Sequence, residues 1–260
     1  MTDLHFERLD ATDGGKQPPL LMLHGLLGSS TNWRSIAKRL VGGRAVITLD
    51  ARNHGKSGHR PTMSYAEMAD DVEKLIGELD IDEADVLGHS MGGKTAMRCA
   101  LRKPVWLRKL VVVDIAPVPR SSNFTLLINA LRSLPVTTSE TRQELDHMLA
   151  ERIPQPALRA FLLQNLERQS RGFRWRINLD AIAEQMNELL DFDVGAQDQF
   201  EGPTLFVLGG DSEYVSNEHI PIIEHLFPAV RITSIASAGH WLHAEQPQRF
   251  VEVVDQFLLR

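Results

Sequence analysis

Cysteine and long apolar runs are almost absent from this sequence. Cys99 is the only cysteine among 260 residues, which excludes a disulfide framework and favours a reducing compartment. No run approaches the roughly 18 apolar residues of a membrane span, and the opening segment MTDLHFER lacks the apolar stretch of a signal peptide. The sequence therefore predicts a cytoplasmic protein with no membrane span.

Patterns typical of metal or nucleic-acid binding are also missing. Neither C-x-x-C nor H-E-x-x-H occurs, and the ten histidines are scattered without the spacing of metal ligands. The net charge of −6 argues against a nucleic-acid or anionic-membrane partner. We expect no metal and no cofactor.

Short aliphatic runs alternate with helical patterns along most of the chain. The expected strands cover residues 4–9, 20–23, 45–49, 85–87, 110–113, 204–208 and 231–235. The expected helices between them cover residues 32–41, 64–79, 91–101, 217–226 and 248–259. Strands that are apolar throughout are typical of parallel sheets covered on both faces. The alternation predicts an α/β fold with a mostly parallel, doubly wound sheet.

The alternation stops between about residues 118 and 201, where no convincing apolar strand occurs. The helices expected there cover residues 124–134, 140–153, 157–169 and 179–190. A segment this long is neither a simple connection nor a linker. We therefore expect a helical cap, or lid, at 118–201, inserted into a core made of residues 1–117 and 202–260.

The motif Gly88-His89-Ser90-Met91-Gly92 lies between an apolar strand pattern and a helical pattern. This is G-x-S-x-G in the context that a nucleophile elbow requires, a strand, a sharp turn and a helix. The turn holds the serine in a strained conformation with its hydroxyl exposed at the end of the sheet. Ser90 is therefore the candidate nucleophile.

A serine nucleophile needs a base, and the base needs an acid to hold its tautomer. His240 follows the last expected strand and is the candidate base, with His243 as the weaker one. Two aspartates at the carboxyl ends of strands, Asp114 and Asp211, are candidates for the acid. The order Ser, Asp, His fits either choice.

The loop at residues 24–28, HGLLG, follows a strand and precedes a helix. The backbone amide of Leu26 can pair with that of Met91 to form an oxyanion hole. The alternative of a phosphate-binding loop is weak, because neither G-x-G-x-x-G nor a P-loop lysine is present. In the next loop we expect Asp50 and Arg52 to pair locally.

The cap segment carries a cluster of four arginines within nine residues, which are Arg168, Arg171, Arg174 and Arg176. Such a cluster can bind an anionic head group, for example the phosphates of coenzyme A. It can equally be a solvated face paired with acids such as Glu167 and Asp180.

Several segments resemble the bacterial YbfF-type esterases and their eukaryotic abhydrolase-domain relatives, within the α/β-hydrolase superfamily. They are HGLLGSSTNW (24–33), LDARNHGKSGH (49–59), MSYAEMADDV (63–72), LGHSMGGKTAM (87–97), LVVVDIAP (110–117), FRWRINL (173–179), GGDSEYVS (209–216) and AGHWLHAEQP (238–247). The combination of R-N-H-G, D-I-A-P and G-G-x-S-x-Y-V is more specific than G-x-S-x-G. The resemblance covers nearly the whole chain and implies an α/β-hydrolase fold.

The resemblance also bears on the acid. In most α/β-hydrolases the acid lies three residues before a valine that follows the later strand, and Ser212 stands there. In the esterases that this chain resembles, the aspartate of D-I-A-P serves instead. The resemblance therefore implies Asp114 as the acid, with Ser212 in the hydrogen-bond network of His240, and leaves Asp211 as the alternative.

Together, these features predict a cofactor-free serine hydrolase, a carboxylesterase or acyl thioesterase, acting on a small-molecule acyl ester or thioester. The acyl pocket is expected to be lined by Phe124, Leu127, Leu131, Phe161 and Trp175, with Arg174 and Arg176 as further substrate contacts. The alternatives are another reaction on the same triad, such as C–C hydrolysis or perhydrolysis, and a ligand sensor that keeps the triad.

Overall fold

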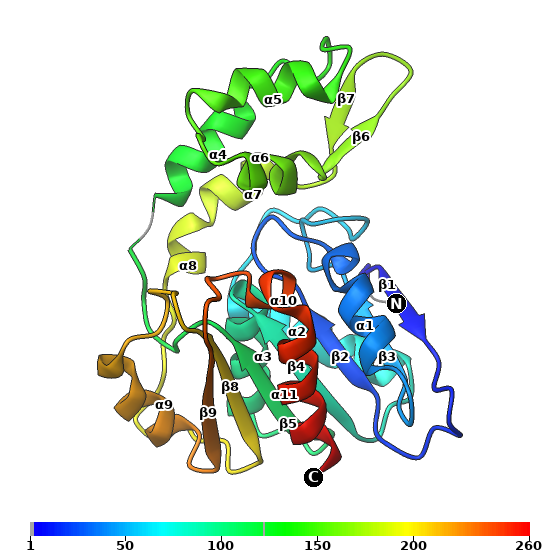
Figure 1. Cartoon of the computed structure of the whole chain (residues 1–260), viewed down its shortest axis with the longest axis vertical. Helices are drawn as coiled ribbons and strands as arrows, with labels where there is room; N and C mark the ends of the chain where they lie inside the picture. Colours follow the sequence, from blue (N-terminus) through cyan, green and yellow to red (C-terminus); the bar gives the residue numbers. More distant parts are fainter. Residues whose placement is uncertain (1–2, 122) are drawn as a thin grey trace.

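The fold is a twisted sheet with helices on both faces (Figure 1). The computed structural model describes residues 3–121 and 123–260. Within these residues the sheet has seven strands in the order β1-β3-β2-β4-β5-β8-β9. Their bounds are β1 (Phe6–Leu9), β2 (Leu20–Leu23), β3 (Val46–Leu49), β4 (Ala84–His89), β5 (Leu107–Val113), β8 (Thr204–Gly209) and β9 (Val230–Ile235). Strand β1 is antiparallel to β3 and the other pairs are parallel, which confirms the predicted fold class.

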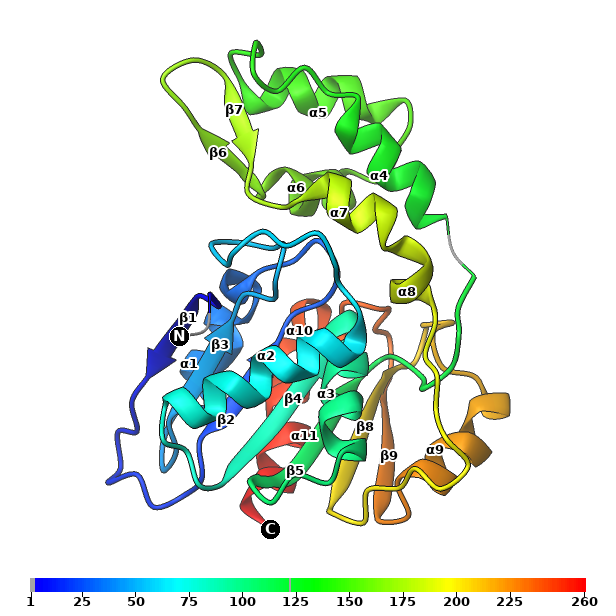
Figure 2. The same ribbon diagram turned by 180° about the vertical axis from the view of Figure 1, so that it is seen from behind.

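Helices cover both faces because successive strand residues point to opposite sides of the sheet. Leu21 and Val86 pack on the face of α2, α3 and α9, whereas Leu20 and Leu87 pack on the face of α1 and α11. Helix α11 lies in front in Figure 1, and α2 lies in front in Figure 2. The bounds are η1 (Ser30–Trp33), α1 (Arg34–Leu40), α2 (Tyr65–Glu78), α3 (Met91–Leu101), η2 (Asn217–His219), α9 (Ile220–Leu226), α10 (Leu242–Glu245) and α11 (Pro247–Leu259).

Strand β4 passes directly into α3 through Ser90, whose backbone has φ 53° and ψ −117°. This positive φ is strained for a residue with a side chain. A Cβ on Gly88 would lie 2.1 Å from the carbonyl oxygen of Gly92, and one on Gly92 would lie 2.4 Å from that of Leu23. Strand and helix can approach this closely only because both positions are glycine.

The loops beyond β2 and β3 are held together by buried polar side chains. The Asp50 carboxylate accepts the backbone N–H groups of Ser30 at 2.6 Å and Lys56 at 2.8 Å. His54 accepts the N–H of Leu27 at its Nε2, at 3.0 Å. Burial lowers the pKa of His54 from its ordinary 6.5 to about 3, so the ring is neutral and can accept this bond.

The expected pairing of Asp50 with Arg52 is wrong. Arg52 reaches α2 instead, where its Nε and Nη2 donate to the Asp71 carboxylate at 2.6 and 3.0 Å and its Nη1 lies 3.0 Å from Glu67. Asp50 turns toward Gly55, where a Cβ would lie 2.2 Å from its carboxyl group. Backbone N–H groups stabilise the Asp50 carboxylate without an arginine, and Arg52 anchors the loop to α2.

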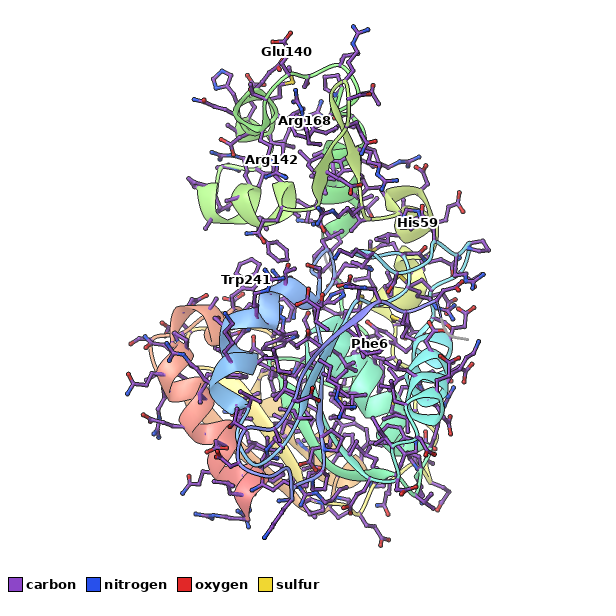
Figure 3. All side chains as sticks on the ribbon, turned by 90° about the vertical axis from the view of Figure 1, so that its right-hand side faces the viewer. Phe6, His59, Glu140, Arg142, Arg168 and Trp241 are labelled. Atoms are coloured by element: carbon purple, nitrogen blue, oxygen red, sulfur yellow. The ribbon has the colours of Figure 1, made fainter. Side chains whose placement is uncertain are left out.

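Within the inserted segment, residues 124–190 form a layer beyond the carboxyl ends of the parallel strands (Figure 1). Its described helices are α4 (Phe124–Arg132), α5 (Arg142–Ala150), α6 (Pro156–Leu163), α7 (Leu179–Glu184) and α8 (Met186–Leu190). The chain after Leu190 returns to the core, where the N–H of Phe200 donates to the carbonyl oxygen of Leu226 at 2.8 Å. The single helix expected at 179–190 is divided at Gln185, where φ is −95° and ψ is 10°. His59, labelled in Figure 3, lies where this layer meets the core, with Nε2 at 2.9 Å from the carbonyl oxygen of Arg176.

The expectation that the inserted segment has no strand, and a helix up to residue 169, is wrong. Helix α6 ends at Leu163, and β6 (Leu166–Arg168) pairs antiparallel with β7 (Phe173–Trp175). The turn between them contains Gly172, with φ 66°, where a Cβ would lie 2.2 Å from the carbonyl oxygen of Thr137. Apolar residues alternate with arginines over residues 173–177, which is the period of a strand and the signal by which the sequence could have revealed β7.

The elbow glycines lead to a first prediction. We expect Gly88→Ala to lower the free energy of unfolding by about 3 kcal/mol or more, because the new methyl group meets backbone rather than a side chain that can move. Gly77→Ala is the matched control. Gly77 is exposed on α2, and a Cβ added there would have nothing within 4 Å, so this change should stabilise by about 0.5–1 kcal/mol. Urea unfolding measures both, and an unaffected Gly88→Ala would contradict the packing argument.

The neutral His54 leads to a second prediction. Its pKa is about 3 in the folded chain, against 6.5 for an ordinary histidine. Below pH 6.5 the unfolded chain therefore binds a proton that the folded chain does not, and the free energy of unfolding decreases as the pH is lowered. Between pH 7 and pH 5 this one group should cost about 2 kcal/mol. In His54→Gln, which keeps a side-chain acceptor, that part of the loss should disappear. The measurement is the free energy of unfolding at both pH values, and equal losses in the two proteins would refute the prediction.

Candidate active site

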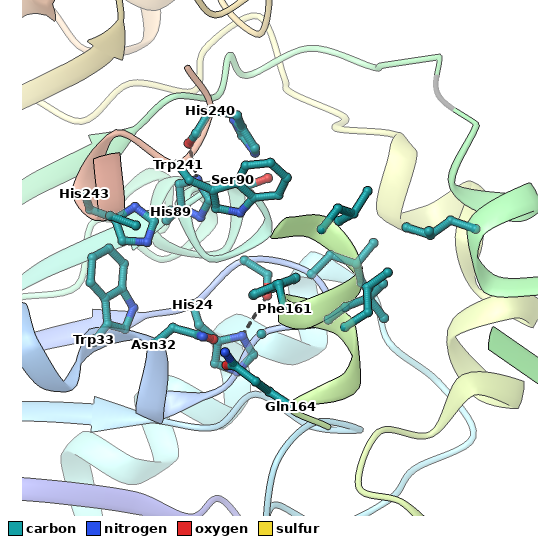
Figure 4. Close-up of a pocket in the computed structure, with 18 of the residues that line it drawn as sticks. His24, Asn32, Trp33, His89, Ser90, Phe161, Gln164, His240, Trp241 and His243 are labelled. Atoms are coloured by element: carbon teal, nitrogen blue, oxygen red, sulfur yellow. Dashed lines mark hydrogen bonds between the residues drawn. The ribbon is translucent and has the colours of Figure 1, made fainter. Parts of the chain in front are cut away.

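Ser90 lies at the carboxyl edge of the sheet and lines a cavity of about 360 Å³ (Figure 4). Its backbone N–H donates to the carbonyl oxygen of Val113 on the neighbouring strand β5, at 3.0 Å. The cavity lies between the core and residues 118–201, and His240 lines it as well. The strained serine and the candidate base therefore line the same cavity.

The structure brings Asp114 to His240. The Nδ1 of His240 lies 2.7 Å from Oδ2 of Asp114, which is fully buried directly after β5. The hydroxyl of Ser212 donates to the same Oδ2, and the N–H of Gly209 donates to Oδ1 at 2.9 Å. With Nδ1 donating to the carboxylate, Nε2 of the neutral ring is left as an acceptor, which a general base requires.

Asp211, the alternative acid, lies elsewhere. It is exposed, and its backbone N–H donates to the carbonyl oxygen of Ala238 at 2.9 Å. Strands β5 and β8 are neighbours in the sheet, so Asp114 and Asp211 both follow strands at the same edge. The direction of each side chain at its strand end, which the sequence does not reveal, separates the two.

Leu26 and Met91 lie on either side of the nucleophile. Leu26 is in the loop after β2 and lines the cavity with Ser90. The loop passes so close that a Cβ on Gly25 would lie 3.4 Å from the Cβ of Ser90. Met91 is the first residue of α3, and the N–H groups in the first turn of a helix have no partner within the helix. Both residues therefore lie beside Ser90, and their amides remain the candidates for an oxyanion hole.

The other histidines near the site are buried. Nε2 of His89 lies 2.9 Å from the carbonyl oxygen of His240, so His89 ties the base's backbone to the elbow. The ring of His243 packs on Trp33 with 4.5 Å between centroids. Burial lowers the pKa of His243 to about 3 and holds that of His89 well below its ordinary value. Neither ring faces a carboxylate as His240 does.

The apolar wall of the cavity agrees only in part with the expected acyl pocket. Phe124, Leu127 and Phe161 line it as expected. Leu131 does not, because it is fully buried in the packed interior. Trp175 is also absent from the wall and lies on β7 beside a different hollow. Residues of the wall that the sequence did not single out include Asn32, Leu158, Leu162, Gln164, Tyr214 and Trp241.

Arg174 and Arg176, the further substrate contacts expected from the sequence, do not line the Ser90 cavity. Both line a separate hollow of about 350 Å³, together with Lys56 and Trp175. Arg174 is paired with Glu167, as the alternative of a solvated face anticipates. Arg174 lies on β7 and Arg176 directly follows it, so the hairpin carries both arginines to this separate hollow.

The described residues include no helix long and apolar enough to cross a membrane. They also contain no group of three or more His, Cys, Asp or Glu side chains arranged to hold a metal ion.

Comparison with known proteins identifies the family of this chain. The sequence model of the alpha/beta hydrolase fold matches residues 18–247. The chain is 42% identical over 258 residues to the sn-1-specific diacylglycerol lipase ABHD11 of Danio rerio, covering 96% of this chain and 81% of that protein. It is 33% identical to esterase YbfF of Escherichia coli, covering 92% of each. A solved marine microorganism esterase superposes with a TM-score of 0.93 at 37% identity, covering 99% of this chain and all of that one. The chain belongs to the α/β-hydrolase fold family.

Proposed function

We propose that this chain is a serine carboxylesterase in which Ser90 is the nucleophile, His240 the base and Asp114 the orienting acid. The observation that carries the proposal is the contact of 2.7 Å between His240 and the buried Asp114, in the cavity that Ser90 lines. The esterase and lipase names of its relatives support the same reaction class.

In this proposal His240 takes the hydroxyl proton as Ser90 attacks the acyl carbonyl. Asp114 stabilises the imidazolium that forms, and the amides of Leu26 and Met91 bind the oxyanion. The intermediate collapses when His240 gives its proton to the leaving alcohol, which leaves an acyl-enzyme. His240 then activates water, and the acid is released without a cofactor.

Residues 118–201 act in this proposal as a cap that forms the acyl pocket. Phe124, Leu127 and Phe161 supply an apolar wall for the chain of the acid. Asn32 and Gln164 place two amide groups at another part of the same cavity (Figure 4), where a polar alcohol can bind. The cytoplasmic location stays a prediction of the sequence.

An acyl-coenzyme A thioester is the second candidate substrate, and the basic hollow favours it. That hollow is lined by three basic side chains, Lys56, Arg174 and Arg176, and by one carboxylate, Glu167. Three cations against one carboxylate leave an excess of positive charge, which suits the phosphates of coenzyme A.

C–C hydrolysis and perhydrolysis stay alternative reactions on the same triad, whereas ligand sensing predicts no turnover. A panel of short and long acyl esters and acyl-coenzyme A thioesters, with Ser90→Ala as control, separates an esterase from a sensor. An esterase turns over many times, whereas a sensor binds or is acylated once per chain.

The third prediction concerns the triad. Ser90→Ala should lose on the order of 10³-fold or more in kcat, and Asp114→Asn about 10⁴-fold, because the amide favours the wrong tautomer of His240. Asp211→Asn is the matched control and should keep most of its activity. Ser212→Ala removes one hydrogen bond to the Asp114 carboxylate, worth about 1.5–3 kcal/mol, and its activity should fall between those of the two aspartate variants. Steady-state kinetics on one ester measure all four, and a dead Asp211→Asn beside an active Asp114→Asn would overturn the assignment.

The fourth prediction concerns the thioester. Arg176→Ala should raise KM for an acyl-coenzyme A roughly tenfold or more, because it removes a charge-assisted contact. KM for an uncharged ester of the same acid should stay unchanged. Arg171→Ala, an exposed arginine of the same cluster outside the hollow, serves as control. Equal effects on both substrates would refute binding of coenzyme A here and would favour the interpretation of the arginines as a solvated face.

A further inference from the structure

The candidate base is in contact with an aromatic ring that the proposed chemistry does not use. Tyr214 stacks on His240 with 3.5 Å between ring centroids and 13° between the ring planes. Tyr214 lies on the loop after β8, and its N–H donates to the Ser212 hydroxyl at 3.2 Å. The loop that supplies a donor to Asp114 thus also supplies a flat surface to His240.

An arginine covers the other face of the same ring. The guanidinium carbon of Arg120 lies 3.6 Å from the centroid of Tyr214. Two groups at these distances cannot share one face, so Tyr214 is held between the imidazole and the guanidinium. A guanidinium over a tyrosine face is attracted by the ring's electrons. Contacts on both faces therefore fix the position of the Tyr214 ring.

Arg120 belongs to the root of the inserted segment. Its backbone N–H donates to the carbonyl oxygen of Leu190, the last residue of α8, at 2.8 Å. The ammonium of Lys94 on α3 donates to the carbonyl oxygens of Leu190 at 3.3 Å and Asp191 at 3.2 Å. The backbone at Arg120, the end of α8 and the helix that follows Ser90 are thus joined, and this junction fixes Arg120 over Tyr214.

A hydrogen bond to Nδ1 alone leaves the ring of His240 free to turn about that contact. Turning moves Nε2, the atom that must take the proton from Ser90. A flat group against the imidazole removes that freedom, because the ring can then move only within one plane. Carboxylate and stacked ring together define one orientation.

We propose that Tyr214 is a positioning residue for His240, and that Arg120 holds it in place from the root of the cap. This inference rests on the proposed function, since it concerns the base of that reaction. This role also accounts for the tyrosine in the G-G-x-S-x-Y-V motif.

The kinetic experiment uses an uncharged short-chain ester and the full-length chain. Tyr214→Leu should lower kcat by on the order of 10–100-fold with KM within about twofold, because misplacing a catalytic group affects the chemical step. Tyr214→Phe keeps the ring and should recover most of that loss. Glu213→Ala, a change at the exposed neighbour, is the matched control.

A double-mutant cycle tests the part of Arg120. Arg120→Met should lower kcat by a smaller factor, and the double variant with Tyr214→Leu should be no slower than Tyr214→Leu alone, because both changes remove the same constraint. Arg120 also lines, with Ser90 and Lys94, a small second cavity. If Arg120→Met instead raises only KM, only for esters with an anionic group, and adds to Tyr214→Leu, then Arg120 binds substrate and its positioning role is refuted.

A spectroscopic measurement makes the test independent of turnover. Protons of His240 above the Tyr214 face should resonate upfield through the ring current, move downfield in Tyr214→Leu and stay upfield in Tyr214→Phe. Thermal unfolding checks that each variant is folded. Unmoved His240 resonances with unchanged kcat in Tyr214→Leu would overturn the proposal. A wild-type chain that turns over no ester would overturn the proposed function, while the resonance shift would still decide whether the stack exists.

Discussion

The order of the whole site depends on how the fold stabilises one buried carboxylate. Asp114 is fully buried at the end of β5, and an anion in such surroundings costs several kcal/mol unless donors surround it. Its described donors are the Gly209 N–H, the Ser212 hydroxyl and the His240 ring. They come from the end of β8 and from the loops after β8 and β9. The fold therefore stabilises the carboxylate and positions the base through the same contacts.

Much of this arrangement could be predicted from the sequence, because its main parts have local signatures. Ser90 stands in a motif whose two glycines are required by the close approach of β4 and α3, and spacing alone reveals them. His240 follows the last strand of the sheet. The acid could not be chosen from the residues themselves, since Asp114 and Asp211 follow neighbouring strands. Resemblance to a family pointed to Asp114, and the structure shows why the two differ, because Asp211 is exposed while Asp114 faces the interior.

The cavity wall could be predicted less well, because it depends on packing between distant segments. Leu127 and Leu131 are one turn apart on α4, and periodicity assigns such a pair to the same surroundings. The structure places Leu127 at the cavity and Leu131 in the packed interior, since the helix runs from one into the other. Trp175 was expected beside the acyl chain because it is a large apolar residue. The short hairpin that carries it turns it toward the hollow of Arg176.

Hydrogen bonds join the inserted segment to two loops of the core that surround the site. Asn165 donates to the carbonyl oxygen of Leu27, next to the candidate oxyanion residue, at 2.7 Å. The N–H of Asn178 donates to the carbonyl oxygen of Asn53 at 2.9 Å, in the loop that contains His54. Since His54 in turn accepts the N–H of Leu27, one network links the segment to the loop beside Ser90. A displacement of the segment would break bonds that fix the site loops, so the shape of the cavity and the alignment of the site cannot change independently.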